Sequence, residues 1–68
     1  MKNTRRKNVV VYVMHKGEKY YFKKISLDGK LYWTKDVNNV RRESIGEARD
    51  TLALLWLRNR KAEIEVVE

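Results

Sequence analysis

The sequence contains no cysteine, which excludes disulfide bonds and thiolate metal ligands. A small secreted scaffold is therefore not expected, and a reducing cytoplasm is the expected location. The apolar run at 9–14 follows a basic stretch, but it is too short for a secretory signal and leads into His15 without a small-residue cleavage site. It is also far too short to cross a membrane, so no membrane partner is expected.

Histidine and glycine are scarce as well, and their scarcity limits the chemistry that the chain can perform. The single histidine, His15, lies beside a predicted turn and has no cysteine or second histidine with which to hold a metal ion. Ser44 has no histidine to activate it as a nucleophile, and three glycines do not form a phosphate-binding loop. We therefore expect no metal, no cofactor and no enzymatic activity.

Positive charge is in excess, and it is unevenly distributed along the chain. The 16 Lys and Arg residues outnumber nine Asp and Glu residues, which gives a formal net charge of +7. Residues 1–35 hold ten of the basic residues, all four tyrosines, and only Glu18 and Asp28 among the acids. Basic and aromatic side chains on one sheet surface can hold phosphates and stack on bases, so a binding module is indicated.

The length allows one small domain, which we place at 9–68 behind a basic, flexible arm at 1–8. Turns are predicted at Lys16-Gly17 and Asp28-Gly29, because glycine tolerates the positive φ of tight turns. The β-branched and aromatic runs around these turns predict three strands, at 9–14, 19–27 and 30–35.

A helix and a fourth strand follow. Ser44 and Glu47 have the spacing of a capping box, which predicts a helix over about 45–60. Alternating apolar and acidic residues at 62–67 predict a last strand, and the helix connection permits it to lie parallel to the first strand. The expected fold is α+β with the order β-β-β-α-β, a mainly antiparallel sheet with the helix packed on one face.

Strand pairing decides which side chains share a face of the sheet. Two-residue turns at both glycines would place Lys24 opposite Trp33 and His15 opposite Glu18. The core face would then carry Val9, Val11, Val13, Tyr20, Phe22, Leu31 and Trp33. The other face, the expected binding surface, would carry Val10, Tyr12, Lys19, Tyr21, Lys23, Ile25, Lys30, Tyr32 and Thr34. A three-residue loop at either turn would shift the pairing by one residue and exchange the faces of a strand.

The helical periodicity predicts an apolar stripe that covers the sheet, with Trp56 at its centre. Its members are Ile45, Ala48, Leu52, Leu55, Trp56 and Asn59. Leu54 and Leu57 point away from the stripe, which makes them candidates for a protein interface. The alternatives are that they pack under the loop or the final strand, or that they are single exposed leucines.

Several short motifs occur in a characteristic order: Lys16-Gly17, Lys19-Tyr20-Tyr21-Phe22, Asp28-Gly29-Lys30, Arg41-Arg42 and Ser44-Ile45-Gly46-Glu47-Ala48. Together they resemble the amino-terminal arm-binding domains of phage and transposon tyrosine recombinases and, more distantly, plant AP2 domains. The resemblance covers roughly 9–57 and implies three strands in the DNA major groove with the helix behind them. It implies groove-facing roles for Tyr21, Lys23, Lys30 and Tyr32. The pattern is also similar to that of short phage-encoded proteins, some of which bind host proteins.

Two features depart from the recombinase pattern. Glu43 stands where such domains carry an aromatic residue, and the acidic strand at 62–68 has no counterpart.

Three classes of function remain. The first is a small phage or mobile-element module that binds nucleic acid, with DNA as the expected kind. The expected contact residues are Arg5, Arg6, Lys7, Lys19, Tyr21, Lys23, Lys30 and Tyr32. The second is a module that binds an acidic host protein, through an exposed strand edge or through Leu54 and Leu57. The third is a small structural homodimer.

Overall fold

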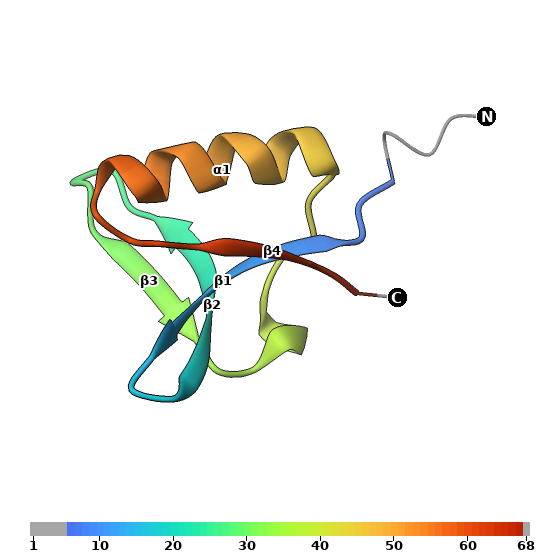
Figure 1. The fold of residues 1–68 in the computed structure, drawn as a ribbon. Helices are drawn as coiled ribbons and strands as arrows, with labels where there is room; N and C mark the ends of the chain where they lie inside the picture. Colours follow the sequence, from blue (N-terminus) through green and yellow to red (C-terminus); the bar gives the residue numbers. More distant parts are fainter. Residues whose placement is uncertain (1–5, 68) are drawn as a thin grey trace.

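The computed structural model describes residues 6–67 and shows the expected α+β fold (Figure 1). Its elements are β1 (Val9–His15), β2 (Glu18–Ile25), β3 (Leu31–Thr34), the short 3-10 helix η2 (Val37–Asn39), α1 (Ile45–Leu57) and β4 (Glu63–Val66). The four strands form one antiparallel sheet in the order β3-β2-β1-β4, and α1 lies on one face of it.

The β1–β2 hairpin has the predicted register. His15 pairs with Glu18, and between them Lys16 and Gly17 adopt positive φ angles of 53° and 81°. Positive φ at both central residues is the geometry that matches the right-handed twist of the flanking strands.

The turn between β2 and β3 is longer than predicted. The Gly29 amide donates to the Ser26 carbonyl at 3.0 Å, and the Ser26 amide donates to the Lys30 carbonyl at 2.9 Å. Ser26 and Lys30 therefore face each other beyond the strand ends, and three residues lie in the loop between them, with Gly29 at a φ of 87°. The side chain of Asp28 stabilises this wider turn by accepting a hydrogen bond from the Lys30 amide at 3.3 Å.

The predicted pairing of Lys24 with Trp33 is therefore wrong. Lys24 pairs with Tyr32, and Phe22 pairs with Trp33, because the register shifts between Phe22 and Lys24. Lys23 is the extra residue of this bulge. With the longer turn and the bulge, Phe22 and Trp33 lie on the core face as predicted, whereas Lys24 lies on the opposite face beside Tyr32.

The hydrophobic core lies between α1 and the sheet. The buried residues of this cluster are Val9, Val11, Phe22, Ala48, Leu55 and Ala62, and Val13, Leu31, Trp33, Ile45, Leu52 and Ile64 pack against it. The predicted core face of the sheet is thus confirmed, except that Tyr20 is only partly buried at its margin.

The end of the predicted helical stripe is wrong. Trp56 is 53% exposed and is not at the centre of the packing; Leu55 occupies that position with no exposed surface. Asn59 lies beyond the end of α1 and adopts a left-handed φ of 64°. The helix ends at Leu57 because the left-handed conformation of Asn59 redirects the chain, and the Arg60 amide donates back to the Leu55 carbonyl at 2.8 Å.

The last strand is antiparallel to β1, so a parallel arrangement is excluded. Val9 pairs with Val66 and Tyr12 pairs with Glu63. The reason is the direction of α1, which begins next to Val9 and ends towards the far end of β1 (Figure 1). A strand that follows the helix closely must therefore run back along β1.

The segment before α1 joins the sheet at the start of β1. Val9 and Glu43 exchange two backbone hydrogen bonds, at 2.9 and 2.8 Å. Val10 was expected on the exposed binding surface, but it is only 1% exposed. It borders a hollow shared with Ile25, Val40 and Leu54, because β1 and β2 diverge there and the segment before the helix occupies the gap.

Candidate nucleic-acid interface

Aromatic and basic side chains gather on the sheet face that points away from α1. We call this surface the tyrosine face and define it by Tyr12, Lys19, Tyr21, Lys24 and Tyr32. The Tyr12 and Tyr21 rings meet edge to face at 6.4 Å, and the Lys19 ammonium lies 4.4 Å from the Tyr12 ring centre. The Lys24 ammonium lies 5.4 Å from the Tyr32 ring centre. Three of the sequence-predicted site residues, Lys19, Tyr21 and Tyr32, are thus brought onto one face.

Strand β4 adds two carboxylates to this face. Lys19 Nζ donates to Glu65 Oε1 at 3.1 Å, and the Tyr12 hydroxyl donates to Glu63 at 3.0 Å. The hydrogen bond to Glu65 raises the pKa of Lys19, and the hydrogen bond to Glu63 raises the pKa of Tyr12. The carboxylates lower the positive potential where a phosphate would approach, so the tyrosine face is less basic than its lysines alone indicate.

Lys23 and Lys30 do not extend the tyrosine face in the way the sequence predicted. Lys23 is exposed at the bulge and borders the hollow beneath Leu54. Lys30 precedes β3 and borders a different hollow, together with Arg58 and Arg60 from the end of the helix region.

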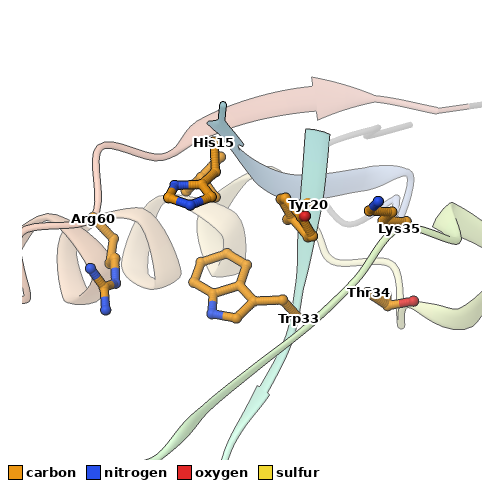
Figure 2. Close-up of a pocket in the computed structure, with 7 residues that line it drawn as sticks. His15, Tyr20, Trp33, Thr34, Lys35 and Arg60 are labelled. Atoms are coloured by element: carbon orange, nitrogen blue, oxygen red, sulfur yellow. The ribbon is translucent and has the colours of Figure 1, made fainter. Parts of the chain in front are cut away.

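A second surface lies on the α1 side of the sheet, where an open hollow of about 530 Å³ contains exposed aromatic rings. Figure 2 shows the Trp33 ring between Arg60 and Tyr20, with His15 and Lys35 also at the rim. An adjoining hollow shares Trp33 and Arg60 and adds Gly29, Lys30, Leu31 and Arg58. We call the two hollows together the Trp33 groove; the described residues that line them include no carboxylate.

The Trp33 groove exists because α1 covers only part of the sheet. The helix packs mainly on β1 and β4. Phe22 of β2 is still buried in the core, but Tyr20 and Trp33 lie at the margin of the core and are only partly buried. Trp33 is supported from one side by Phe22, whose ring meets it edge to face at 5.4 Å.

Local contacts position the cations of the groove. Arg58 Nη1 donates to the Gly29 carbonyl at 2.7 Å, which joins the end of α1 to the β2–β3 turn. Lys35 forms an ion pair with Glu18 from outside the groove lining, and its ammonium lies 5.4 Å from the Tyr20 ring centre. The hydrogen bond between them raises the pKa of Lys35 and lowers the pKa of Glu18. Both groups therefore remain charged over the physiological pH range.

Of the predicted arm residues, Arg6 and Lys7 do not line the Trp33 groove. Arg5 lies outside the described residues. Lys7 forms an exposed ion pair with Glu47 at 3.3 Å, near the start of α1. Arg6 is exposed and also has an interaction partner.

The two leucines proposed as a protein interface are in different environments. Leu54 is partly buried and borders the hollow with Val10 and Ile25, so it packs towards the gap between β1 and β2. Leu57 is 84% exposed. The two residues therefore do not form one apolar surface that a partner would cover.

Within residues 6–67, no group of three or more His, Cys, Asp or Glu side chains gathers in a way that could hold a metal ion. None of the helices in this part of the chain is long and apolar enough to span a membrane. Comparison with known proteins finds no family model, no curated protein and no solved structure that matches the chain. The interpretation of the surface therefore depends on its geometry and charge.

Sequence reasoning missed the combination of Trp33 with Arg60 and Arg58. It assigned Trp33 to the core, which is correct for the part of the ring that contacts Phe22, but the ring also lines the open hollow. Lys35, close to Trp33 in the sequence, was a local signal of a basic neighbourhood. No local signal indicates where α1 stops covering the sheet.

Proposed function

We propose that this chain is a non-catalytic nucleic-acid-binding module whose contact surface is the Trp33 groove. The observation that supports the proposal is the partly exposed aromatic surface of Trp33 and Tyr20, bordered by Lys30, Arg58 and Arg60 and by Lys35, which is paired with Glu18. Cations neutralise phosphates, and aromatic rings contact bases or sugars. The absence of cysteine supports an action in the cytoplasm.

The same class of function was expected from the sequence, but the geometry favours a different surface. On the tyrosine face, Lys19 is already paired with Glu65, and Glu63 lies beside it on β4. A phosphate that approached Lys19 would have to exchange with one carboxylate and would be repelled by both. In the Trp33 groove, Lys35 is likewise paired with Glu18, but the guanidinium of Arg58 is held by a neutral carbonyl, which leaves its charge available to a phosphate.

A binding assay with two matched variants tests the proposal. Labelled oligonucleotides are bound at 50 and 200 mM salt, and neutralisation of three to four phosphates should lower the affinity about 20- to 50-fold between these conditions. Lys30→Gln with Arg60→Gln should weaken binding and flatten the salt dependence. Lys23→Gln with Lys24→Gln removes the same charge outside the Trp33 groove and should have a smaller effect.

Two results would contradict the proposal. Absence of saturable binding to any oligonucleotide at 50 mM salt would eliminate nucleic acid as the partner. Binding that is lost in the Lys23 and Lys24 variant but kept in the Lys30 and Arg60 variant would retain the partner and reject the Trp33 groove as its contact surface.

A further inference from the structure

Resting on the proposed function, we infer that the Trp33 groove binds a single-stranded nucleic acid by stacking one unpaired base on Trp33. The indole ring is the feature from which the inference starts. Its contact with Phe22, at 5.4 Å between ring centres, holds the ring in place from within the core. The rest of the ring faces an open hollow, so a stacking surface is present before any ligand binds (Figure 2).

The volume of the hollow is large enough for a nucleobase. Its volume of about 530 Å³ lies within the range of about 300–1,000 Å³ that is usual for small-molecule sites. Val13 and Tyr20 provide further apolar surface next to Trp33. The site is therefore concave, apolar at its centre and basic at its rim.

A concave site selects for an unpaired base. In a duplex the faces of the bases are covered by their neighbours, and a protein reaches only the base edges by inserting a helix or strand into a groove. Here Trp33 is only partly exposed and lies in an open hollow beside Val13 and Tyr20. A single strand can turn one base into such a hollow, because its bases are free to leave the stack.

The cations of the rim lie on both sides of that base, where the phosphate backbone of the strand would pass. Lys35 lies at the rim beside Tyr20, whereas Arg60 lies across Trp33 from Tyr20 in Figure 2. Arg58 and Lys30 continue the positive charge into the adjoining hollow beyond Arg60. A phosphate on the Arg60 side of the stacked base would therefore meet several cations, whereas one on the Tyr20 side would meet Lys35, whose charge is partly offset by its ion pair with Glu18. The excess of positive charge favours an anionic strand over a neutral aromatic ligand.

The two tryptophans of the chain make the inference testable by fluorescence. Trp56→Phe leaves Trp33 as the single fluorophore, and Trp33→Phe leaves Trp56, which is the matched control. The probe is a ten-nucleotide single-stranded oligodeoxynucleotide. We expect it to quench Trp33 saturably and to leave Trp56 unchanged, because stacking places a base directly on the indole of Trp33.

Three further probes separate stacking from charge attraction. An abasic oligomer of the same length has the same phosphates and should bind without quenching Trp33. A duplex of the same sequence should bind at least about fivefold more weakly than the single strand, and a ten-residue polyglutamate should not quench. Trp33→Leu should weaken binding of the base-bearing strand at least about fivefold, with unchanged affinity for the abasic oligomer. Trp33→Phe retains an aromatic ring and should lie between Trp33→Leu and the parent, which gives the comparison if Trp33→Leu fails to fold.

Distinct results overturn the inference and the proposed function. If oligonucleotides bind in a salt-dependent way but leave Trp33 emission unchanged, or if the abasic oligomer or polyglutamate quenches equally, base stacking is rejected and charge-driven binding is retained. Tighter binding of the duplex than of the single strand rejects the inference as well. If no nucleic acid binds by filter retention, the proposed function is rejected together with it.

Discussion

Leu55→Ala is the substitution that tests the packing of α1 on the sheet most directly. Leu55 has no exposed surface and lies in the core cluster with Val9, Val11 and Phe22. The substitution removes three buried carbon atoms, and at about 0.8 kcal/mol for each buried CH₂ group the lost transfer free energy is about 2.4 kcal/mol. The cavity left behind adds to this, so we expect a loss of about 3–4 kcal/mol.

That loss is large for a chain of 68 residues. Domains of this length have unfolding free energies of about 3–10 kcal/mol, so the variant should be marginally folded or unfolded at 37 °C. In a domain of this size each kcal/mol corresponds to a shift of about 4–8 °C in Tm, which predicts a decrease of at least about 12 °C. Thermal and urea unfolding followed by circular dichroism would measure it.

Trp56→Ala is the matched control, because Trp56 is the neighbouring residue and was expected from the helical periodicity to be the central one. Its side chain is 53% exposed, and its indole N–H donates to the Ala62 carbonyl at 3.0 Å. About half of the cost of a fully buried tryptophan, roughly 1.5–2.5 kcal/mol, is expected. A lower Tm for Trp56→Ala than for Leu55→Ala, or a melt of Leu55→Ala within about 3 °C of the parent, would refute the packing described here.

Two further predictions concern carboxylates. Burial raises the pKa of Glu43 in the folded protein, so the stability that its protonation contributes at low pH is lost as the pH rises through that pKa. Glu43→Gln keeps an acceptor for the Thr51 hydroxyl and should therefore be more stable than the parent at pH 7 and match it near pH 3. A less stable variant at pH 7 would show that the charge is favourable. Because Glu65 raises the pKa of Lys19, the stability that this pair contributes to the fold is present below the ordinary lysine pKa of about 10.4 and is lost as the pH rises above it. Glu65→Gln should lower the pKa of Lys19, measured by NMR titration of its side chain. An unchanged titration would show that the pair does not persist in solution.

The elements and their local geometry followed from the sequence where neighbouring residues decide them. The positive φ at Gly17 and the register of the first hairpin depend on the turn alone. The capping box was also predictable, because Ser44 and Glu47 satisfy each other's backbone amides within one helical turn, at 3.2 and 3.0 Å. The α+β class followed from the order of these elements.

The predicted strand pairing was wrong where one extra residue in a turn changes the register. A glycine turn of either two or three residues satisfies the same local pattern around Asp28-Gly29, and the choice moved Lys24 to the face of Tyr32. Trp56 lies at the margin of the stripe formed by Ile45, Ala48, Leu52 and Leu55, so a small rotation of the helix decides whether Trp56 is covered.

Tertiary structure alone decided where a ligand could bind. Glu65 reaches Lys19 only because β4 pairs with β1, which brings together residues that are 46 positions apart. Arg60 lines the same hollow as Trp33 only because α1 ends where it does and leaves Trp33 partly exposed. Turns and caps are set by steric and hydrogen-bonding effects within a few residues, whereas the charge and depth of a surface depend on which distant segments pack beside it.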